Sequence, residues 1–448
     1  MFSTGGLSID QAPPLHLPVR FFATAPLFML FAGLTSIYFA EDLLLTPLMP
    51  ETVAFAHLAV LGWVLMIMFG AMYQMIPVLA GLPVPKPGLV PWVHGLLVMG
   101  VITMALGIAT DIHPWLLLFA SLGLGGSIAL FVIPVGIALF KAPAKHPTVT
   151  AMRISLISLV GVLAMGAIFL GEYSHGFYDF NREALVAVHL TWGLFGWVGT
   201  LIMGVSFQVL PMFYMTPEFP KKTAFQILIA WSLSLIFLPL VLFYHPENST
   251  LLWASALPGL LALLLYGVNM KTMLSQRKRV LVDLTYRFWL LGFASATVAL
   301  ILFALWPGVE DDNIRLLFGI FYIIGWATSI LLGMLYKIVP FIIWFHRFSK
   351  LAGLVKIPMM DNLLPQKAVT LHFPIHIVTV LAYFLAIIIE SPLLTMFAGG
   401  CLIVSGGILA YGIWFALSIE PPQAPEIPDF ESFFKDMEIP PPAKQTDK

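Results

Sequence analysis

Twelve apolar segments of about twenty residues or more constrain this chain most strongly. Backbone N–H and C=O groups find no water in lipid, so such a segment must satisfy them internally as a helix. Of the 448 residues, 60% are hydrophobic and only 10% are charged, unlike a soluble domain. The sequence therefore predicts an all-α integral membrane protein with about 12 transmembrane helices, at roughly 21–40, 52–79, 90–110, 114–140, 149–171, 183–214, 223–244, 250–270, 285–306, 313–345, 371–390 and 393–418.

Charge predicts the orientation of these spans. With twelve spans, the N-terminus and the even-numbered loops share one side, and the basic residues gather there: Arg20, Lys86, Lys141, Lys145, Lys221, Lys222, Lys271, Arg277, Lys278, Arg279, Arg347, Lys350, Lys356 and Lys367. The opposite side has two bases and twelve acids: Arg182, Arg315, Glu41, Asp42, Glu51, Asp111, Glu172, Asp179, Glu183, Glu247, Glu310, Asp311, Asp312 and Glu390. By the positive-inside rule we expect cytoplasmic termini in a bacterial-type inner membrane.

The chain divides into a cytoplasmic N-terminal segment (1–20), a membrane domain (21–418) and a proline- and acid-rich tail (419–448) that we expect to be disordered and cytoplasmic. The net charge of −1 gives no reason to expect a nucleic-acid partner. The single cysteine, Cys401, excludes internal disulfides and cysteine-ligated zinc or iron–sulfur sites. The bilayer is therefore the partner that the composition predicts.

One pattern occurs three times, on predicted helices 2, 6 and 10. It consists of Gly-Trp, a second glycine eight residues after the first, and a proline seven residues later, as in Gly62-Trp63, Gly70, Pro77; Gly196-Trp197, Gly204, Pro211; and Gly325-Trp326, Gly333, Pro340. Each copy lies on the second helix of a four-helix unit. We therefore predict three pseudo-symmetric four-helix repeats, at about 21–140, 149–270 and 285–418, parallel rather than inverted. Close helix packing alone also explains the glycines.

Most of the eleven histidines lie in loops or near the ends of predicted helices, and two do not. His57 and His189 each follow a glutamate, Glu51 and Glu183, by six residues, so both lie roughly 9 Å below the outer end of their helices. Imidazole is a common ligand of haem iron and copper, and polar groups at this depth usually face a partner in the bundle. A buried histidine bonded to a neighbouring carbonyl is the other interpretation.

The repeat predicts that these two histidines face different surroundings. Aligned on the glycine pattern, His57 matches Thr191 rather than His189. Two residues correspond to about 200° of helical rotation. We therefore expect the two side chains to point into different spaces between the repeats.

Several other residues are weaker candidates. His372 and His376 form an i, i+4 pair that suits a metal, although an interfacial pair without metal is commoner. Lys337 replaces the glutamine of the other repeats, and we favour snorkelling toward the cytoplasm over pairing with a carboxylate.

Three residues of a predicted loop and four methionines are further candidates. We place Glu172, Tyr173 and His175 in a solvated outer loop, with contact to a substrate or partner as the alternative. Four methionines cluster near the inner ends of helices 2 and 6, where thioethers suit Cu(I) but gap-filling is the commoner role: Met72, Met75, Met212 and Met215.

The chain resembles the catalytic subunit (subunit I) of the haem-copper oxidase and nitric oxide reductase superfamily. Helix 2, with His57-Leu-Ala-Val-Leu-Gly-Trp63 running on to Gly70-Ala-Met-Tyr73-Gln-Met-Ile-Pro77, is similar to the helix that carries a low-spin haem ligand. His189, in His-Leu-Thr-Trp192, matches the helix-6 position of a copper ligand in that family. The resemblance implies three four-helix units over about 20–418, with haem, copper and a cytochrome or cupredoxin electron partner.

The chain also departs from that family. The family carries two histidines on helix 10, one for each haem iron, and a histidine pair near the start of helix 7. In this chain helix 10, from Asp312 to Phe345, has no histidine, and neither does helix 7, from Ala224 to Phe243. The binuclear oxygen-reducing centre is therefore incomplete, since the high-spin iron has no axial ligand. One low-spin haem on His57, with Met334 as its other ligand, stays compatible with the sequence, as does copper on His57 and His189.

We therefore predict a divergent oxidase-like membrane protein that binds haem or copper and acts in electron transfer or as an accessory part of a respiratory complex. The alternatives are a multi-pass transporter and a structural subunit of a membrane complex. The transporter fits less well, because ion-coupled carriers usually need charge near the midplane and we find no acidic residue inside a predicted span.

Overall fold

The computed structural model describes residues 11–110, 112–143, 146–175, 181–278, 283–305 and 311–423, and every named element within them is a helix. Nine spans are single helices: α1 (His16–Tyr38), α4 (Val90–Thr110), α5 (Trp115–Lys141), α6 (Pro147–His175), α9 (Lys221–Tyr244), α10 (Ser249–Ser275), α11 (Leu284–Leu305), α14 (Gln366–Ile388) and α15 (Pro392–Ser418). With the three composite spans below, the described residues contain 12 helices long and apolar enough to cross a membrane. The all-α membrane prediction is confirmed.

The second, sixth and tenth spans each contain a π-helical stretch between two α-helices. Their segments are α2 (Pro50–His57), η3 (Leu58–Leu65) and α3 (Met66–Ala80); α7 (Arg182–Leu190), η5 (Thr191–Gly199) and α8 (Thr200–Tyr214); α12 (Asp312–Gly319), η7 (Ile320–Thr328) and α13 (Ser329–Arg347). Each π stretch contains the Gly-Trp pair of the repeated pattern. Such stretches are rare, and they occur frequently at functional sites.

These three composite spans (Pro50–Ala80, Arg182–Tyr214 and Asp312–Arg347), here called the central spans, form the interior of the bundle. Between 56% and 72% of their most apolar windows is buried, whereas every other span except α1 has 44% or less. The central spans also contact one another. Trp63 Nε1 donates to Thr328 Oγ1 at 3.0 Å, and Tyr322 Oη donates to the Leu194 carbonyl at 2.8 Å.

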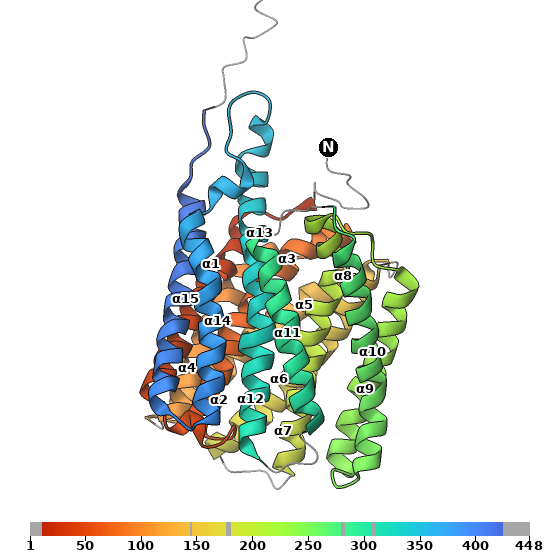
Figure 1. Ribbon diagram of the computed structural model, residues 1–448, viewed down its shortest axis with the longest axis vertical. Helices are drawn as coiled ribbons and strands as arrows, with labels where there is room; N and C mark the ends of the chain where they lie inside the picture. The colour runs from red at the N-terminus through yellow and green to blue at the C-terminus, as the bar shows by residue number, and fades with distance from the viewer. Residues whose placement is uncertain are drawn as a thin grey trace, which may run out of the picture.

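The remaining spans pack around this centre (Figure 1). Their exposed faces carry large apolar side chains. On α9, seven large apolar or aromatic side chains are exposed: Ile229, Leu233, Ile236, Phe237, Leu240, Phe243 and Tyr244. A soluble protein rarely exposes a continuous apolar surface of this kind, whereas lipid tails cover it at no cost. The described part of the chain is therefore suited to a bilayer. Three short 3₁₀ helices, η4 (Pro87–Leu89), η8 (Ser349–Leu351) and η9 (Met360–Leu363), lie in connections at the end where α1 begins and α15 ends, and η2 (Asp42–Leu44) lies at the opposite end.

The helix boundaries differ from the sequence prediction mainly at the start. The first helix begins at His16 rather than at 21, so part of the predicted N-terminal segment is helical. Arg20 stays within the helix because its Nε donates to the His16 carbonyl at 3.1 Å. Other predictions fall outside the described residues: the segment 1–10, most of the tail (424–448) and the charged residues Asp111, Lys145, Asp179, Arg279 and Glu310.

The pattern glycines bring each central span close to the span that precedes it. A Cβ on Gly70 would lie 2.9 Å from Phe21 Cβ in α1, and one on Gly333 would lie 3.0 Å from Phe288 Cβ in α11. In the sixth span a Cβ on Gly204 would overlap the Cβ of Ala151 in α6. Small residues allow this close approach in lipid. The recurrence is compatible with three related units, and the three-repeat organisation stays a prediction.

We predict that Gly204→Ala destabilises the protein by about 1–3 kcal/mol, because the new methyl overlaps Ala151 and the two helices must separate. Gly125→Ala in α5 is the matched control, since a Cβ there meets no atom within 4 Å. Thermal unfolding in detergent measures both. Equal melting temperatures for the two variants would show that the glycine contact does not set the helix spacing.

Candidate metal site between the second and sixth spans

His57 and His189 occupy similar places at the start of the π stretches. His57 is the last residue of α2, directly before η3, and His189 is the second-last residue of α7, directly before Leu190 and η5. Both side chains are partly buried. A change of helix type alters the rotation of the residues that follow, so each π stretch changes how its histidine is oriented relative to the lower part of the same span.

The two imidazole rings lie side by side. Their centroids are 6.3 Å apart, and the ring planes are inclined by 34°. The expectation that the histidines point into different spaces is therefore wrong. It assumed that both helices use the same face toward their neighbours. The second and sixth spans run in parallel and touch each other, so they must meet through different faces, and residues about half a turn apart on those helices then face each other.

His57 has a defined hydrogen-bonding state. Its Nδ1 lies 2.7 Å from the carbonyl oxygen of Val53. A carbonyl only accepts, so Nδ1 carries the proton and Nε2 presents a free lone pair. Metal-binding histidines are commonly oriented in this way, with the non-ligating nitrogen bound to a backbone carbonyl.

His189 is held by packing rather than by a hydrogen bond on Nδ1. The ring of Phe169 packs edge-on at a centroid distance of 5.6 Å. Nδ1 of His189 is buried and has no hydrogen-bond partner. A buried polar atom without a partner costs free energy, and binding of an ion or ligand to that atom removes the cost. The apolar surroundings favour neutral imidazole, the form that binds a metal.

The pair fits a single metal ion. An ion bonded at about 2 Å to one nitrogen of each ring places collinear ring centres roughly 6 Å apart. Ordinary aromatic contacts cover the same distance, so the free Nε2 of His57 and the unpartnered Nδ1 of His189 are the more specific observations. No group of three or more His, Cys, Asp or Glu side chains occurs in the described residues. The site therefore suits an ion that accepts few protein ligands.

Met334 does not lie near His57. The Trp63–Thr328 hydrogen bond places these two residues at the same level of the bundle. His57 and Met334 lie on opposite sides of this level along the helix axes. Twelve helical residues, about 18 Å along the axis, separate the two side chains. The structure therefore does not bring together the ligand pair that we expected for a haem, and His189 is the neighbour of His57 instead.

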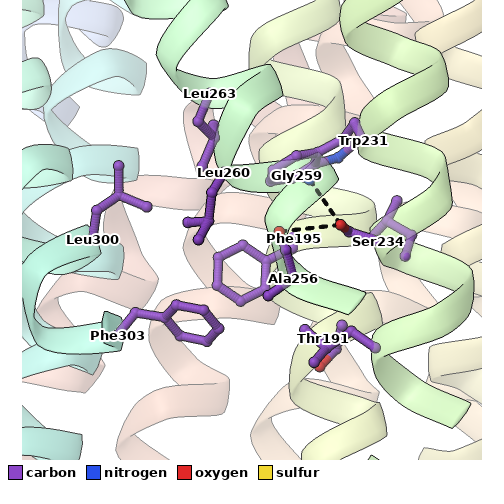
Figure 2. Close-up of a pocket in the computed structure, with 12 residues that line it drawn as sticks. Thr191, Phe195, Trp231, Ser234, Ala256, Gly259, Leu260, Leu263, Leu300 and Phe303 are labelled. Carbon is purple, nitrogen blue, oxygen red and sulfur yellow. Dashed lines mark hydrogen bonds between the residues drawn. The ribbon is translucent and has the colours of Figure 1, made fainter. Parts of the chain in front are cut away.

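Neither His57 nor His189 lines either of two cavities that lie in the described part of the chain. The first has a volume of about 40 Å³ and lies between η5, α9, α10 and α11 (Figure 2). Its polar groups bond each other, since Ser234 Oγ accepts from the Gly259 N–H at 2.7 Å. The aromatic rings of Phe195 and Phe303 form another wall, 5.4 Å apart. This cavity offers packing space and no ligand chemistry.

The second cavity lies between the central spans and has a volume of about 60 Å³. Met334 lines it, together with Met72 and Met75. The other two methionines of the predicted cluster, Met212 and Met215, are exposed at the inner end of the sixth span. The four methionines therefore do not form one group.

The i, i+4 pair on α14 is buried inside the bundle rather than interfacial. His372 hydrogen-bonds the Tyr336 hydroxyl through Nδ1 at 2.6 Å and the Ser405 hydroxyl through Nε2. His376 Nε2 lies 2.9 Å from Ser329 Oγ, which itself donates to a backbone carbonyl. Three of the four ring nitrogens thus bond side chains of α13 or α15, which suits a structural role.

Lys337 forms an ion pair instead of snorkelling. Its Nζ lies 2.5 Å from Asp283 Oδ2, and the two side chains are 11% and 22% exposed. The preferred prediction, that Lys337 snorkels toward the cytoplasm, was wrong, and the alternative, that it pairs with a carboxylate, was right. Asp283 precedes α11 directly, and an acid beside a helix start on the basic side was the signal that we missed. Burial alone raises the pKa of Asp283, but hydrogen bonds from Lys337, Thr285 and the Tyr286 N–H, with the charge of Lys337, hold that pKa below its usual value.

The residues assigned to an outer loop belong to a helix. Glu172, Tyr173 and His175 form the last turns of α6, although the side chains of 173–175 lie outside the description. Glu172 makes an ion pair with Arg182, with 3.6 Å between Oε2 and Nε. This pair joins the end of α6 to the start of α7, the helix that carries His189.

We predict that Lys337→Met costs about 3 kcal/mol, because it leaves the Asp283 carboxylate partly buried without its cation. The double variant Lys337→Met/Asp283→Leu recovers most of the loss, since no charge stays unpaired. Because the folded-state pKa of Asp283 is depressed, the contribution of the pair is present above about pH 3.8, the ordinary value, and disappears as the pH falls through the folded-state value. Thermal unfolding in detergent measures both effects, and additive losses in the double variant would contradict the coupling.

No protein-family model and no curated protein matches this sequence. The family resemblance of the second and sixth spans stays a prediction, and it acquires no support from these comparisons. A function for the chain must therefore be inferred from the chemistry and geometry of its own side chains, above all from the histidine pair.

Proposed function

We propose that this chain is a membrane protein that binds copper between its second and sixth spans, with His57 and His189 as the ligands, and that it serves electron transfer or metal handling. The placement of the two rings side by side, with centroids 6.3 Å apart, is the observation from which this proposal starts. The free lone pair on His57 Nε2 and the unpartnered Nδ1 of His189 add to it.

Copper suits this site better than other common metals. Zinc sites usually carry four ligands, or three with a bound water, and hard cations need carboxylates. Cu(I) accepts few ligands, and imidazole suits it well. When bound, copper supplies one-electron chemistry, Cu(I) to Cu(II). The chain itself contributes neutral ligands, the carbonyl that orients His57, and aromatic packing that keeps water from His189.

The site lies near one surface of the membrane, roughly 9 Å below the outer helix ends. That depth suits exchange of copper or electrons with a partner outside the bilayer, such as a cytochrome, a cupredoxin or another respiratory subunit. Membership of the haem-copper oxidase superfamily, as a divergent member without a complete oxygen-reducing centre, is part of this proposal.

A haem on His57 is the second candidate. The fixed proton on Nδ1 and the free Nε2 suit an axial haem ligand as well as a copper ligand. A macrocycle also needs a flat slot beside the ring, and neither of the two cavities described above borders His57. Met334 is too far along the bundle to be the second ligand. Copper is therefore the better-supported metal.

We predict that the histidine pair of the purified protein binds one equivalent of Cu(I) in competition with a chromogenic Cu(I) chelator, and that His57→Ala and His189→Ala each weaken the binding of that equivalent at least tenfold. His94→Ala is the matched control, because His94 is also a partly buried histidine but hydrogen-bonds Thr24 at 2.9 Å. Unchanged Cu(I) affinity in both site variants would overturn the assignment.

An oxidised-minus-reduced visible spectrum on the same sample separates copper from haem. A sharp low-spin band with stoichiometric iron, lost in His57→Ala, would replace copper by haem. A flat spectrum with neither metal bound would leave a transport or structural role for the fold.

We also propose that both termini face the cytoplasm of a bacterial-type inner membrane. The predicted result is that green fluorescent protein fused after the last residue is fluorescent, whereas alkaline phosphatase fused there is inactive. Phosphatase inserted after Glu247, in the connection between α9 and α10, should be active. The reverse pattern would invert the proposed orientation and place the histidine pair near the cytoplasm.

A further inference from the structure

The central cavity has an unusual set of walls. It is enclosed by the three central spans with α1, α6 and α11, and 18 residues line it. Five of them are methionines: Met68, Met72, Met75, Met152 and Met334. The whole chain has 21 methionines among 448 residues, so thioethers are strongly concentrated here.

Three of the five belong to one helical face. Met68, Met72 and Met75 follow an i, i+4, i+7 spacing on α3, which places them on the same side of that helix. Met152 comes from α6 and Met334 from α13, so the thioethers approach from three different helices. Met68, Met72, Met152 and Met334 are each 7% exposed or less. Ligands from several helices can surround one ion.

The other walls contain no ionisable side chain. The remaining lining residues are aliphatic or aromatic apart from Ser206, whose hydroxyl is bonded to the Met203 carbonyl at 2.6 Å and to Tyr266 at 2.9 Å. Trp289 lines the cavity as well, and its buried Nε1 has no hydrogen-bond partner. Indole is also the aromatic group that attracts cations most strongly.

The residues that line the cavity determine which kind of cation could bind there. Without carboxylates, a divalent ion would be strongly disfavoured, because the Born cost of burial rises with the square of the charge, about fourfold from one charge to two. Hard cations need oxygen ligands. Thioethers bind soft Cu(I). At about 60 Å³ the cavity holds a bare ion or a few water molecules.

We propose that the methionine-lined central cavity is a binding site for a soft monovalent cation, Cu(I), with Met68, Met72 and Met334 as principal ligands. It is distinct from the histidine pair, from which eleven helical residues, about 16 Å, separate it along the second span. The proposal therefore goes beyond the proposed function and holds or fails on its own.

Ag⁺ titration of the full-length protein in chloride-free detergent buffer, followed by calorimetry, tests the proposal. The variant Met68→Leu/Met72→Leu/Met334→Leu removes three thioethers with little change of volume. We expect it to lose one equivalent of bound Ag⁺, or to bind that equivalent at least tenfold more weakly. The control Met104→Leu/Met203→Leu/Met270→Leu changes three buried methionines outside the cavity and should bind like the unmodified protein.

The double variant His57→Ala/His189→Ala should retain the cavity equivalent, which separates this proposal from the histidine site. X-ray absorption of the Cu(I)-loaded double variant should show sulfur neighbours around copper, and this measurement does not depend on the folding of the leucine variant. Ag⁺ binding that is equal in the cavity and control variants, or a copper spectrum without sulfur neighbours, would show that the methionines only fill space.

Discussion

Close approach of the three central spans is the constraint on which the rest of the structure depends. In lipid there is no hydrophobic force between helices, so association relies on van der Waals packing and a few hydrogen bonds. Gly70, Gly204 and Gly333 let the preceding spans α1, α6 and α11 pack closely against the central spans, because a Cβ at any of them would crowd the preceding span. The hydrogen bond from Trp63 to Thr328 then fixes the position of the second span along the tenth. Everything proposed for the interior requires these short distances.

Two sets of buried polar groups differ in how their hydrogen-bonding capacity is used. His372 and the Lys337–Asp283 pair find partners within the protein, so their burial is explained by structure alone. His57 and His189 instead lie next to each other and keep ligating capacity free. Under the proposed function, Nε2 of His57 and Nδ1 of His189 are the two nitrogens that would bind the copper ion.

The two proposed sites offer the same kind of ligands. Neither contains a carboxylate, and both offer neutral nitrogen or sulfur ligands in an apolar environment. Such sites disfavour divalent hard cations and favour a monovalent soft one. Both also involve the second span, so its π stretch lies between the histidine that ends α2 and the methionine face of α3. One central helix thus carries the side chains on which both proposals depend.

The sequence by itself determined the class of fold and the number of spans, because apolar length is a local property and lipid forces each such segment into a helix. It also singled out His57 and His189 by their depth. Only the tertiary structure decided which residues meet. The neighbour of His57 is His189 rather than Met334, and the neighbour of Lys337 is Asp283 rather than solvent. Helical rotation within one span predicts a direction, but contact also depends on the facing helix and on π stretches that no simple sequence period reveals.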